Sequence, residues 1–133
     1  TTPRPRAIPK GGIVANILVV DDDRDILELV RSVLEPAHTV LIAESGPEAL
    51  ELMAKNPIDL LVTDVRMPGM NGFALINEAK VRRPDLNVIV MSAYIDETDE
   101  IASQVLRRYT DIALCKPLHV HQFAELVSAA LNA

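Results

Sequence analysis

Five short apolar blocks, separated by segments with helical periodicity, constrain the fold of this chain more than any other feature. The blocks cover residues 17–20, 39–43, 60–63, 88–91 and 112–115. Each is almost entirely apolar and does not alternate with polar residues, which is typical of strands buried on both faces of a parallel sheet. The sequence therefore predicts five parallel strands, each followed by a helix.

The segments after the blocks space their apolar residues three and four positions apart, as one face of a helix does. In the second of these segments, Ser45 and Glu48 have the spacing of a capping box, which predicts the start of a helix. The other helices are expected from about residue 24, after Gly72, over roughly residues 97–108, and from about Val120. An alternation of strands and helices with right-handed crossovers places helices on both faces of the sheet.

The domain organisation follows from composition and length. Residues 1–15 are rich in Pro, Gly and basic side chains and are expected to form a flexible linker or extension. Residues 16–133 would then form one α/β domain, a (βα)5 doubly wound parallel sheet, which is an ordinary size for a single domain.

The charge balance excludes some classes of function. The formal net charge is −6, and residues 1–15 hold three basic and no acidic residues, so residues 16–133 carry −9. An acidic body argues against direct binding of nucleic acid. No apolar run approaches the roughly 20 residues of a membrane span, so no membrane contact is expected. The single cysteine, Cys115, excludes an internal disulfide and fits a cytoplasmic protein.

Polar side chains follow four of the predicted strands. Asp21 and Asp22 follow the first strand, Asp64 the third, Ser92 the fourth and Lys116 the fifth. Because the carboxyl ends of parallel strands meet at one edge, these side chains should converge there. Like charges that share a site need a cation, and carboxylate oxygens suit Mg²⁺, which often accompanies phosphoryl transfer.

The same acids have a structural alternative. Asp21 and Asp22 could instead cap the following helix, and Asp23 and Asp25 are assigned to its first turn. Asp64 and Lys116, at the ends of other strands, favour the cation site over the capping role for Asp21 and Asp22. The histidines lack the spacing of metal ligands, and we expect them at the surface or as caps.

Four motifs occur in order along the predicted sheet. They are VVDDD at residues 19–23, TDVRMPGMNG at 63–72, VMSA at 90–93 and CKPL at 115–118. Each motif alone is a weak signal, whereas the ordered set on this pattern of strands is specific. With these motifs, residues 16–133 resemble a response-regulator receiver domain of bacterial two-component signalling. The expected strand order is then the flavodoxin-like order 2-1-3-4-5.

The resemblance implies a role for each acid of the site. Asp64 would accept a phosphoryl group from a histidine of a partner protein. Asp21 and Asp22 would hold Mg²⁺, with Asp64 and the backbone carbonyl of Arg66 as the remaining protein ligands.

Two further residues take their roles from the same resemblance. Lys116 would pair with the phosphoryl oxygens, and Ser92 would donate its hydroxyl to the phosphoryl group and move a loop. The domain would therefore not be an enzyme beyond its own Mg²⁺-dependent phosphorylation and dephosphorylation.

The resemblance also implies partners and context. The expected partner is a histidine kinase or a histidine phosphotransfer domain, and a homodimer would use the face formed by the fourth helix, fifth strand and fifth helix. We expect the domain to come from a hybrid sensor kinase or another multidomain regulator. The alternative is a stand-alone regulator with an added N-terminal extension.

The sequence departs from the family pattern near its last strand. Ala113 stands where many receivers carry an aromatic residue, three positions before the lysine, and Tyr109 and Thr110 replace a usual pair of small residues. This leaves open a receiver-like interaction module that is never phosphorylated. A magnesium phosphohydrolase is disfavoured, because Arg66 stands where such enzymes usually carry a second acid.

Overall fold

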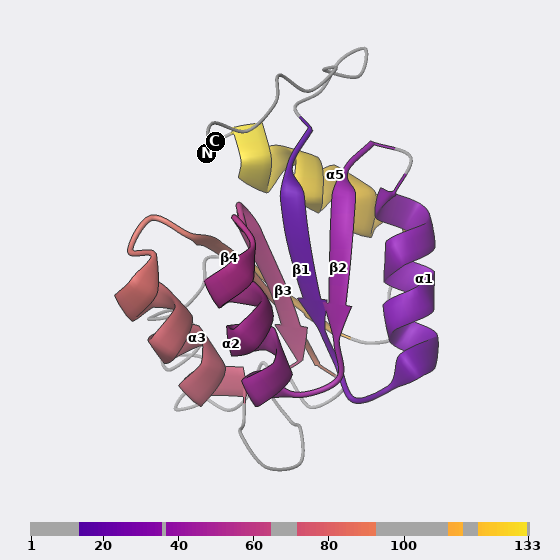
Figure 1. The fold of residues 1–133 in the computed structure, drawn as a ribbon. Helices are drawn as coiled ribbons and strands as arrows, with labels where there is room; N and C mark the ends of the chain where they lie inside the picture. Colours follow the sequence, from indigo (N-terminus) through magenta and orange to yellow (C-terminus); the bar gives the residue numbers. More distant parts are fainter. Residues whose placement is uncertain (1–13, 36, 65–71, 93–111, 116–119, 133) are drawn as a thin grey trace, which may run out of the picture.

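Strands and helices alternate along the described part of the chain from β1 to β4, and β5 and α5 follow further on (Figure 1). The computed structural model describes residues 14–35, 37–64, 72–92, 112–115 and 120–132. The strands are β1 (Asn16–Val20), β2 (Thr39–Ala43), β3 (Leu60–Asp64), β4 (Asn87–Ser92) and β5 (Ile112–Cys115). The helices are α1 (Arg24–Leu34), α2 (Gly46–Lys55), α3 (Gly72–Arg82) and α5 (Val120–Asn132). The helix expected over residues 97–108 and the linker expected over most of residues 1–15 lie outside the described residues.

The strands form one parallel sheet in the order β2-β1-β3-β4-β5. This confirms the predicted α/β class and the predicted strand order. The chain adds β2 on one side of β1 and then crosses to add β3 on the other side. The gap between β1 and β3 is therefore the switch point of the sheet, where ligands of such folds bind.

Helices cover both faces of the sheet and enclose two hydrophobic cores (Figure 1). Successive side chains of a strand point to opposite faces. Accordingly, Leu18 and Val20 of β1 pack in the core beneath α2 and α3, and Ile17 and Val19 pack in the core beneath α1 and α5. Because β1 is buried on both sides, its carboxyl end is held firmly, and the residues that follow it have a fixed position.

The edge strand β2 differs from the prediction. All five apolar blocks were expected to be buried on both faces, and this is wrong for β2, where Thr39 is exposed and residues 40–42 are only half-buried. The physical reason is its position, since β2 has a neighbour on one side only. By contrast, every residue of β3, in the middle of the sheet, is buried.

Side-chain caps start two helices immediately after strand ends. The predicted cap of α2 is confirmed, because Ser45 Oγ accepts a hydrogen bond from the Glu48 backbone N–H at 3.3 Å. Asp23 caps α1 and accepts from the Asp25 N–H at 2.9 Å, as its assignment to the helix start predicted. Both caps lie at the same end of the sheet and fix the direction in which the chain leaves it.

Candidate functional site

Asp21 is the first residue after β1 and lies at the carboxyl end of the sheet. Its backbone N–H donates to the Ala43 carbonyl at 3.2 Å, so the pairing with β2 continues one residue beyond the strand. Its side chain is fully buried at 0% exposure, and its Oδ1 accepts a hydrogen bond from the Asp23 N–H at 2.9 Å. These contacts fix the Asp21 carboxylate at the switch point.

Asp64 is the last residue of β3, the strand beside β1. Its neighbour Thr63 is level with Val20 in the pairing of the two strands, so Asp64 is level with Asp21. Asp64 is 6% exposed, and the Thr63 hydroxyl donates to its backbone carbonyl at 2.8 Å. The two central strands thus bring two buried acids to adjacent positions.

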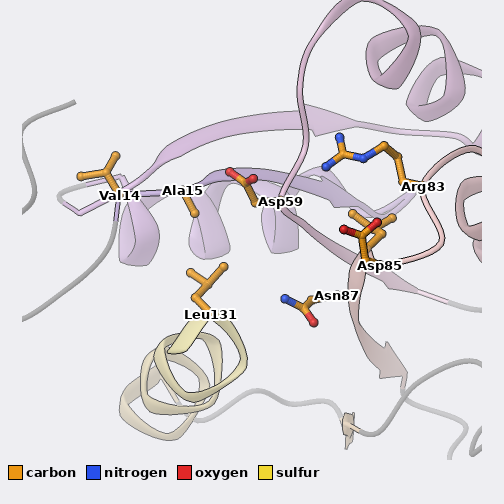
Figure 2. Close-up of a pocket in the computed structure, with 8 residues that line it drawn as sticks. Val14, Ala15, Asp59, Arg83, Asp85, Asn87 and Leu131 are labelled. Carbon is orange, nitrogen blue, oxygen red and sulfur yellow. The ribbon is translucent and has the colours of Figure 1, made fainter. Parts of the chain in front are cut away.

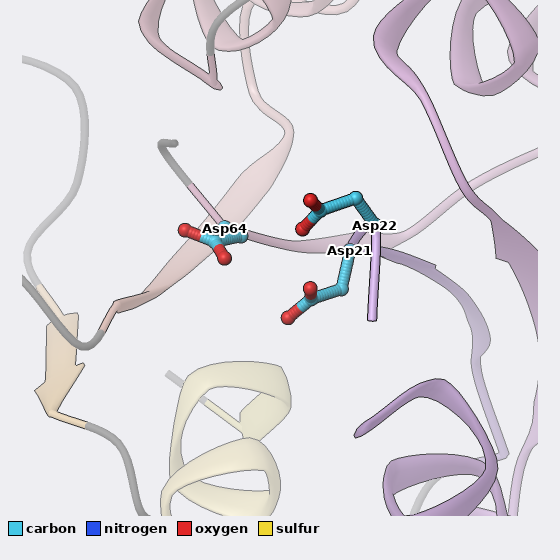
Figure 3. Close-up of side chains that lie close together, drawn as sticks. All are labelled: Asp21, Asp22 and Asp64. Atoms are coloured by element: carbon cyan, nitrogen blue, oxygen red, sulfur yellow. The ribbon is translucent and has the colours of Figure 1, made fainter. Parts of the chain in front are cut away.

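Asp22 completes a cluster of three acids with Asp21 and Asp64. One carboxylate oxygen from each residue lies within 4.8 Å of those of the other two. Figure 3 shows the side chains of Asp21 and Asp22 extending toward the side on which Asp64 lies. Asp22 is exposed, so the cluster is open to solvent on one side. The prediction that strand ends gather these three acids is confirmed.

The chemistry of this donor set suits a hard divalent cation. At an effective dielectric of about 20, two unit charges roughly 5 Å apart repel by about 3 kcal/mol. A cation bound among the three carboxylates replaces this repulsion by attraction, and Mg²⁺ prefers a few carboxylate oxygens together with retained waters. The open side at Asp22 leaves room for such waters. The residues present therefore fit Mg²⁺.

Of the remaining predicted site residues, the structure describes only the backbone of Ser92. Ser92 ends β4 and pairs with Cys115 of β5, so its backbone lies at the same edge of the sheet as the acids. Lys116 directly follows the last residue of β5 but lies outside the described residues, as does Arg66. Their proposed roles, and that of the Ser92 side chain, stay predictions.

An ion pair lies at the same edge of the sheet as the acid cluster. Arg24, in the first turn of α1, and Glu44, directly after β2, approach to 3.5 Å between Nη1 and Oε1. Both side chains are about half exposed or more. The pair joins the loops that follow β1 and β2, but an exposed pair of this kind contributes little to stability.

Sequence reasoning missed two residues that hold the opposite end of β1. Asp59 Oδ2 accepts a hydrogen bond from the Asn16 N–H at 2.8 Å, and His38 Nδ1 accepts from the Ala15 N–H at 3.1 Å. Burial lowers the pKa of His38 below its ordinary value of 6.5. The partners are 43 and 23 residues apart in the chain, so no local pattern reveals them.

None of the described helices is both long enough and apolar enough to cross a membrane. This agrees with the absence of a long apolar run in the sequence.

The fold and the acid cluster together define a class of α/β proteins with a cation site at the switch point of a parallel sheet. A sequence model of the family described as "Response regulator receiver domain" matches residues 17–128. The chain belongs to this family. Receiver domains act in two-component signalling, where they accept phosphoryl groups, typically bind Mg²⁺ at an acidic cluster, and work with histidine kinases or phosphotransfer proteins.

Similar proteins include both longer regulators and single domains. "DNA-binding transcriptional regulator NtrC" of Escherichia coli (strain K12) is 38% identical over 117 residues, which cover 87% of this chain and 24% of NtrC. "Sensor histidine kinase TmoS" of Ectopseudomonas mendocina is 30% identical over 116 residues, 87% of this chain and 12% of TmoS. The chain therefore spans a quarter or less of these two relatives.

A solved structure agrees over almost its full length. The crystal structure of a response regulator receiver domain protein from Clostridium thermocellum superposes with a TM-score of 0.78 at 30% identity. The match covers 90% of this chain and 95% of that chain. The arrangement of strands and helices described above is thus that of a receiver domain.

Proposed function

We propose that Asp64 accepts a phosphoryl group from a phosphohistidine of a partner protein in a reaction that requires Mg²⁺. The observation that carries the proposal is the cluster of Asp21, Asp22 and Asp64, whose oxygens lie within 4.8 Å of one another. The proposed protein ligands of Mg²⁺ are these three carboxylates and the backbone carbonyl of Arg66. Membership of the receiver family supports both parts of the proposal.

The transfer step exchanges one bond to phosphorus for another. A carboxylate oxygen of Asp64 forms a bond to phosphorus while the bond between phosphorus and the histidine nitrogen breaks, and the imidazole leaves with the electron pair. A carboxylate is a weak nucleophile, and the phosphoryl oxygens repel it unless nearby positive charge offsets theirs. Mg²⁺, when bound, supplies part of that charge. The ammonium of Lys116 is proposed to supply the rest by pairing with the phosphoryl oxygens.

The burial of the site supports this division of roles. Asp21 is fully buried and its Oδ1 is held by the Asp23 N–H, so this carboxylate is suited to a fixed position in a ligand set. Asp64 is 6% exposed. A phosphoryl acceptor needs some exposure, because the donor histidine belongs to another protein. Attack of water on the phosphoryl group would release phosphate and restore Asp64. The domain would thus catalyse only its own phosphorylation and dephosphorylation.

Ser92 is the proposed link between phosphorylation and a change of conformation. Support comes from the position of its backbone, one residue beyond Met91, which pairs with Asp64 of β3. A hydroxyl drawn toward a phosphoryl group on Asp64 would move the loop that follows β4. The test compares backbone amide shifts with and without beryllofluoride, a phosphoryl mimic. Large shifts across residues 110–118 that persist in Ser92→Ala would contradict this role.

The parent protein is proposed to be a hybrid sensor kinase or another multidomain regulator. The similarity to TmoS supports the first and the similarity to NtrC supports the second, because each relative is several times longer than the match. In either protein the domain would work in the cytoplasm with a histidine kinase or a histidine phosphotransfer domain. A homodimer through the face formed by β5, α5 and the helix expected over residues 97–108 is part of the same proposal and is tested by sedimentation of the phosphorylated domain.

Intact mass measurement tests the central step. The chain is incubated with acetyl phosphate, once with Mg²⁺ and once with EDTA, beside the variants Asp64→Asn and Asp59→Asn. Asp59 lies at the other end of β3 and is the matched control for the loss of one carboxylate. The expected result is a phosphoryl adduct that requires Mg²⁺, persists in Asp59→Asn and is lost in Asp64→Asn.

One alternative function has support in the sequence. Ala113 replaces the aromatic residue of many receivers, which leaves open an interaction module that is never phosphorylated. The absence of an adduct on folded protein that binds Mg²⁺ would establish this alternative and reject the phosphoryl-acceptor proposal.

A further inference from the structure

A pocket of about 370 Å³ lies at the amino-terminal end of the sheet, remote from the acid cluster. It is lined by residues at the starts of β1 and β4, by Asp59 before β3, and by Leu131 near the end of α5. In parallel strands the amino and carboxyl ends lie on opposite edges, so this pocket is separate from the proposed phosphoryl site. Its volume lies within the range of small-molecule sites.

Arg83 gives the pocket a positive charge. Its backbone is fixed, because its N–H donates to the Ala79 carbonyl at 2.8 Å and its own carbonyl accepts from the Leu86 N–H at 3.0 Å. Its half-buried guanidinium forms no hydrogen bond or ion pair with any residue that the structure describes. The adjacent Arg82, by contrast, donates to the Leu50 carbonyl and pairs with Glu78.

Two carboxylates line the same pocket. Asp59 uses Oδ2 to accept from the Asn16 N–H, whereas its Oδ1 accepts no hydrogen bond within the described part of the chain. Asp85 lies two residues after Arg83, and its carboxylate has no partner among the described residues. Figure 2 shows the Arg83 guanidinium and the Asp85 carboxylate extending toward the side on which Asp59 lies, whereas the Asp59 carboxylate extends toward Ala15. Among the described residues, no ion pair within 4.0 Å joins either acid to Arg83, so the pocket offers both signs of charge to a ligand.

An apolar wall faces these charges. Val14 precedes β1, and the side chain of Leu131 extends from α5 toward the pocket (Figure 2). A simple anion would meet two carboxylates, and a simple cation would meet a guanidinium. A ligand with both charges and an apolar group would satisfy all of the lining residues at once.

We propose that this pocket binds a small zwitterion with an apolar substituent, of the amino acid or dipeptide class. The ligand carboxylate would accept hydrogen bonds from the Arg83 guanidinium, which suits a planar carboxylate because it can donate two parallel bonds. The ligand ammonium would donate to Asp59 and Asp85. The apolar substituent would pack against Val14 and Leu131.

A matched set of dipeptides tests the proposal on the full chain. The probes are glycyl-leucine, N-acetylglycyl-leucine, which lacks the ammonium, and glycyl-leucinamide, which lacks the carboxylate. Binding is followed by the amide shifts of Ala15, Asn87 and Leu131, with Val20 as a reference at the other end of the sheet. Glycyl-leucine should saturate these shifts, and each modified probe should bind at least about tenfold more weakly, because a charge-assisted contact is lost.

Two neighbouring arginines provide the variant and its control. In Arg83→Gln, glycyl-leucine should bind as weakly as glycyl-leucinamide does to the wild type, and the affinity for glycyl-leucinamide should not change. Arg82→Gln removes the same charge one residue away, outside the pocket lining, and should leave all three affinities unchanged. Equal affinities for the three probes, no saturable shift, or equal losses in the two variants would each overturn the proposal.

Discussion

The two ends of β1 use titratable side chains in opposite ways. At the amino end, Asp59 and His38 accept hydrogen bonds from the backbone N–H groups of Asn16 and Ala15. At the carboxyl end, Asp21 and its two acidic neighbours bring three negative charges within 4.8 Å of one another. The first arrangement stabilises the strand by itself, whereas the second gathers like charges whose repulsion a bound cation would relieve.

The difference shows how one sheet separates folding from function. The N–H groups where a strand begins need acceptors once they are removed from water, and side chains from distant segments supply them. The carboxyl end of the same strand carries like charges that a fold selected for stability alone would not gather. Removing an acceptor at the amino end should therefore lower stability, whereas removing an acid of the cluster should raise it when no Mg²⁺ is bound.

The largest expected effect is at the amino end. Asp59→Ala removes the acceptor of the Asn16 N–H and should lower the free energy of unfolding by about 1–3 kcal/mol, the cost of leaving a partly buried donor without a partner. Urea unfolding measures this. A loss well below this range would mean that water replaces Asp59 at no cost and that the two ends differ less than we describe.

A smaller effect is expected at a cap beside the acid cluster. Ser45→Ala removes the hydroxyl that accepts from the Glu48 N–H and should cost about 1 kcal/mol. The loss should be the same with and without Mg²⁺, because the cap acts only on α2. Urea unfolding in both conditions checks the expectation, and a loss that depends on Mg²⁺ would show that the cap and the cluster are coupled.

His38 should make the amino end sensitive to acid. Burial lowers its pKa below 6.5 in the folded state, so the folded state favours the neutral ring that accepts from the Ala15 N–H. The unfolded state binds the proton more readily. This contribution is therefore fully present above about pH 6.5 and is lost as the pH falls through the lower folded-state pKa.

The matched variant is His38→Asn, which keeps an acceptor close to the backbone but does not titrate. The stability of the wild type relative to this variant should fall by up to about 1 kcal/mol, one hydrogen bond, between pH 7 and pH 5. Urea unfolding across this range measures the difference. Parallel pH profiles of the two proteins would rule out the role of His38.

The smallest expected effect concerns the ion pair at the same edge of the sheet as the acid cluster. Glu44→Gln breaks the exposed pair with Arg24 and should change the free energy of unfolding by less than about 0.5 kcal/mol. It should also leave the response to Mg²⁺ unchanged, because Glu44 is not one of the three clustered acids. A clearly weaker response to Mg²⁺ in this variant would extend the cation site to Glu44.

Much of the fold could be predicted from the sequence, because its signals are local. The apolar blocks of β1 and β3 and the cap at Ser45 each follow from a few adjacent residues, and the structure confirms them. The partial exposure of β2 could not be read from its composition, since its residues are as apolar as those of the central strands. The strand order that the family resemblance implied places β2 at the edge, where it lacks a neighbour on one side.

The residues of the candidate site and of the opposite end of β1 also differ in how far the sequence predicts them. The acids Asp21, Asp22 and Asp64 could be predicted to meet, because each follows a strand and parallel strands align their ends. Asp59 and His38 could not be predicted, because each bonds to a strand start that is far away in the sequence. Contacts of this kind depend on the three-dimensional arrangement and leave no local signature.

The most direct test of the central claim is the stability of three proteins with and without saturating Mg²⁺. The wild type should gain stability on adding Mg²⁺, since an ion that binds only the folded state stabilises it. Asp59→Asn, at the amino end, should show the same gain. Asp64→Asn should be more stable than the wild type without Mg²⁺, by about 1 kcal/mol from relieved repulsion, and should lose most of the gain. An equal gain in the wild type and Asp64→Asn would contradict the claim that the carboxyl end of the sheet gathers these acids for a cation.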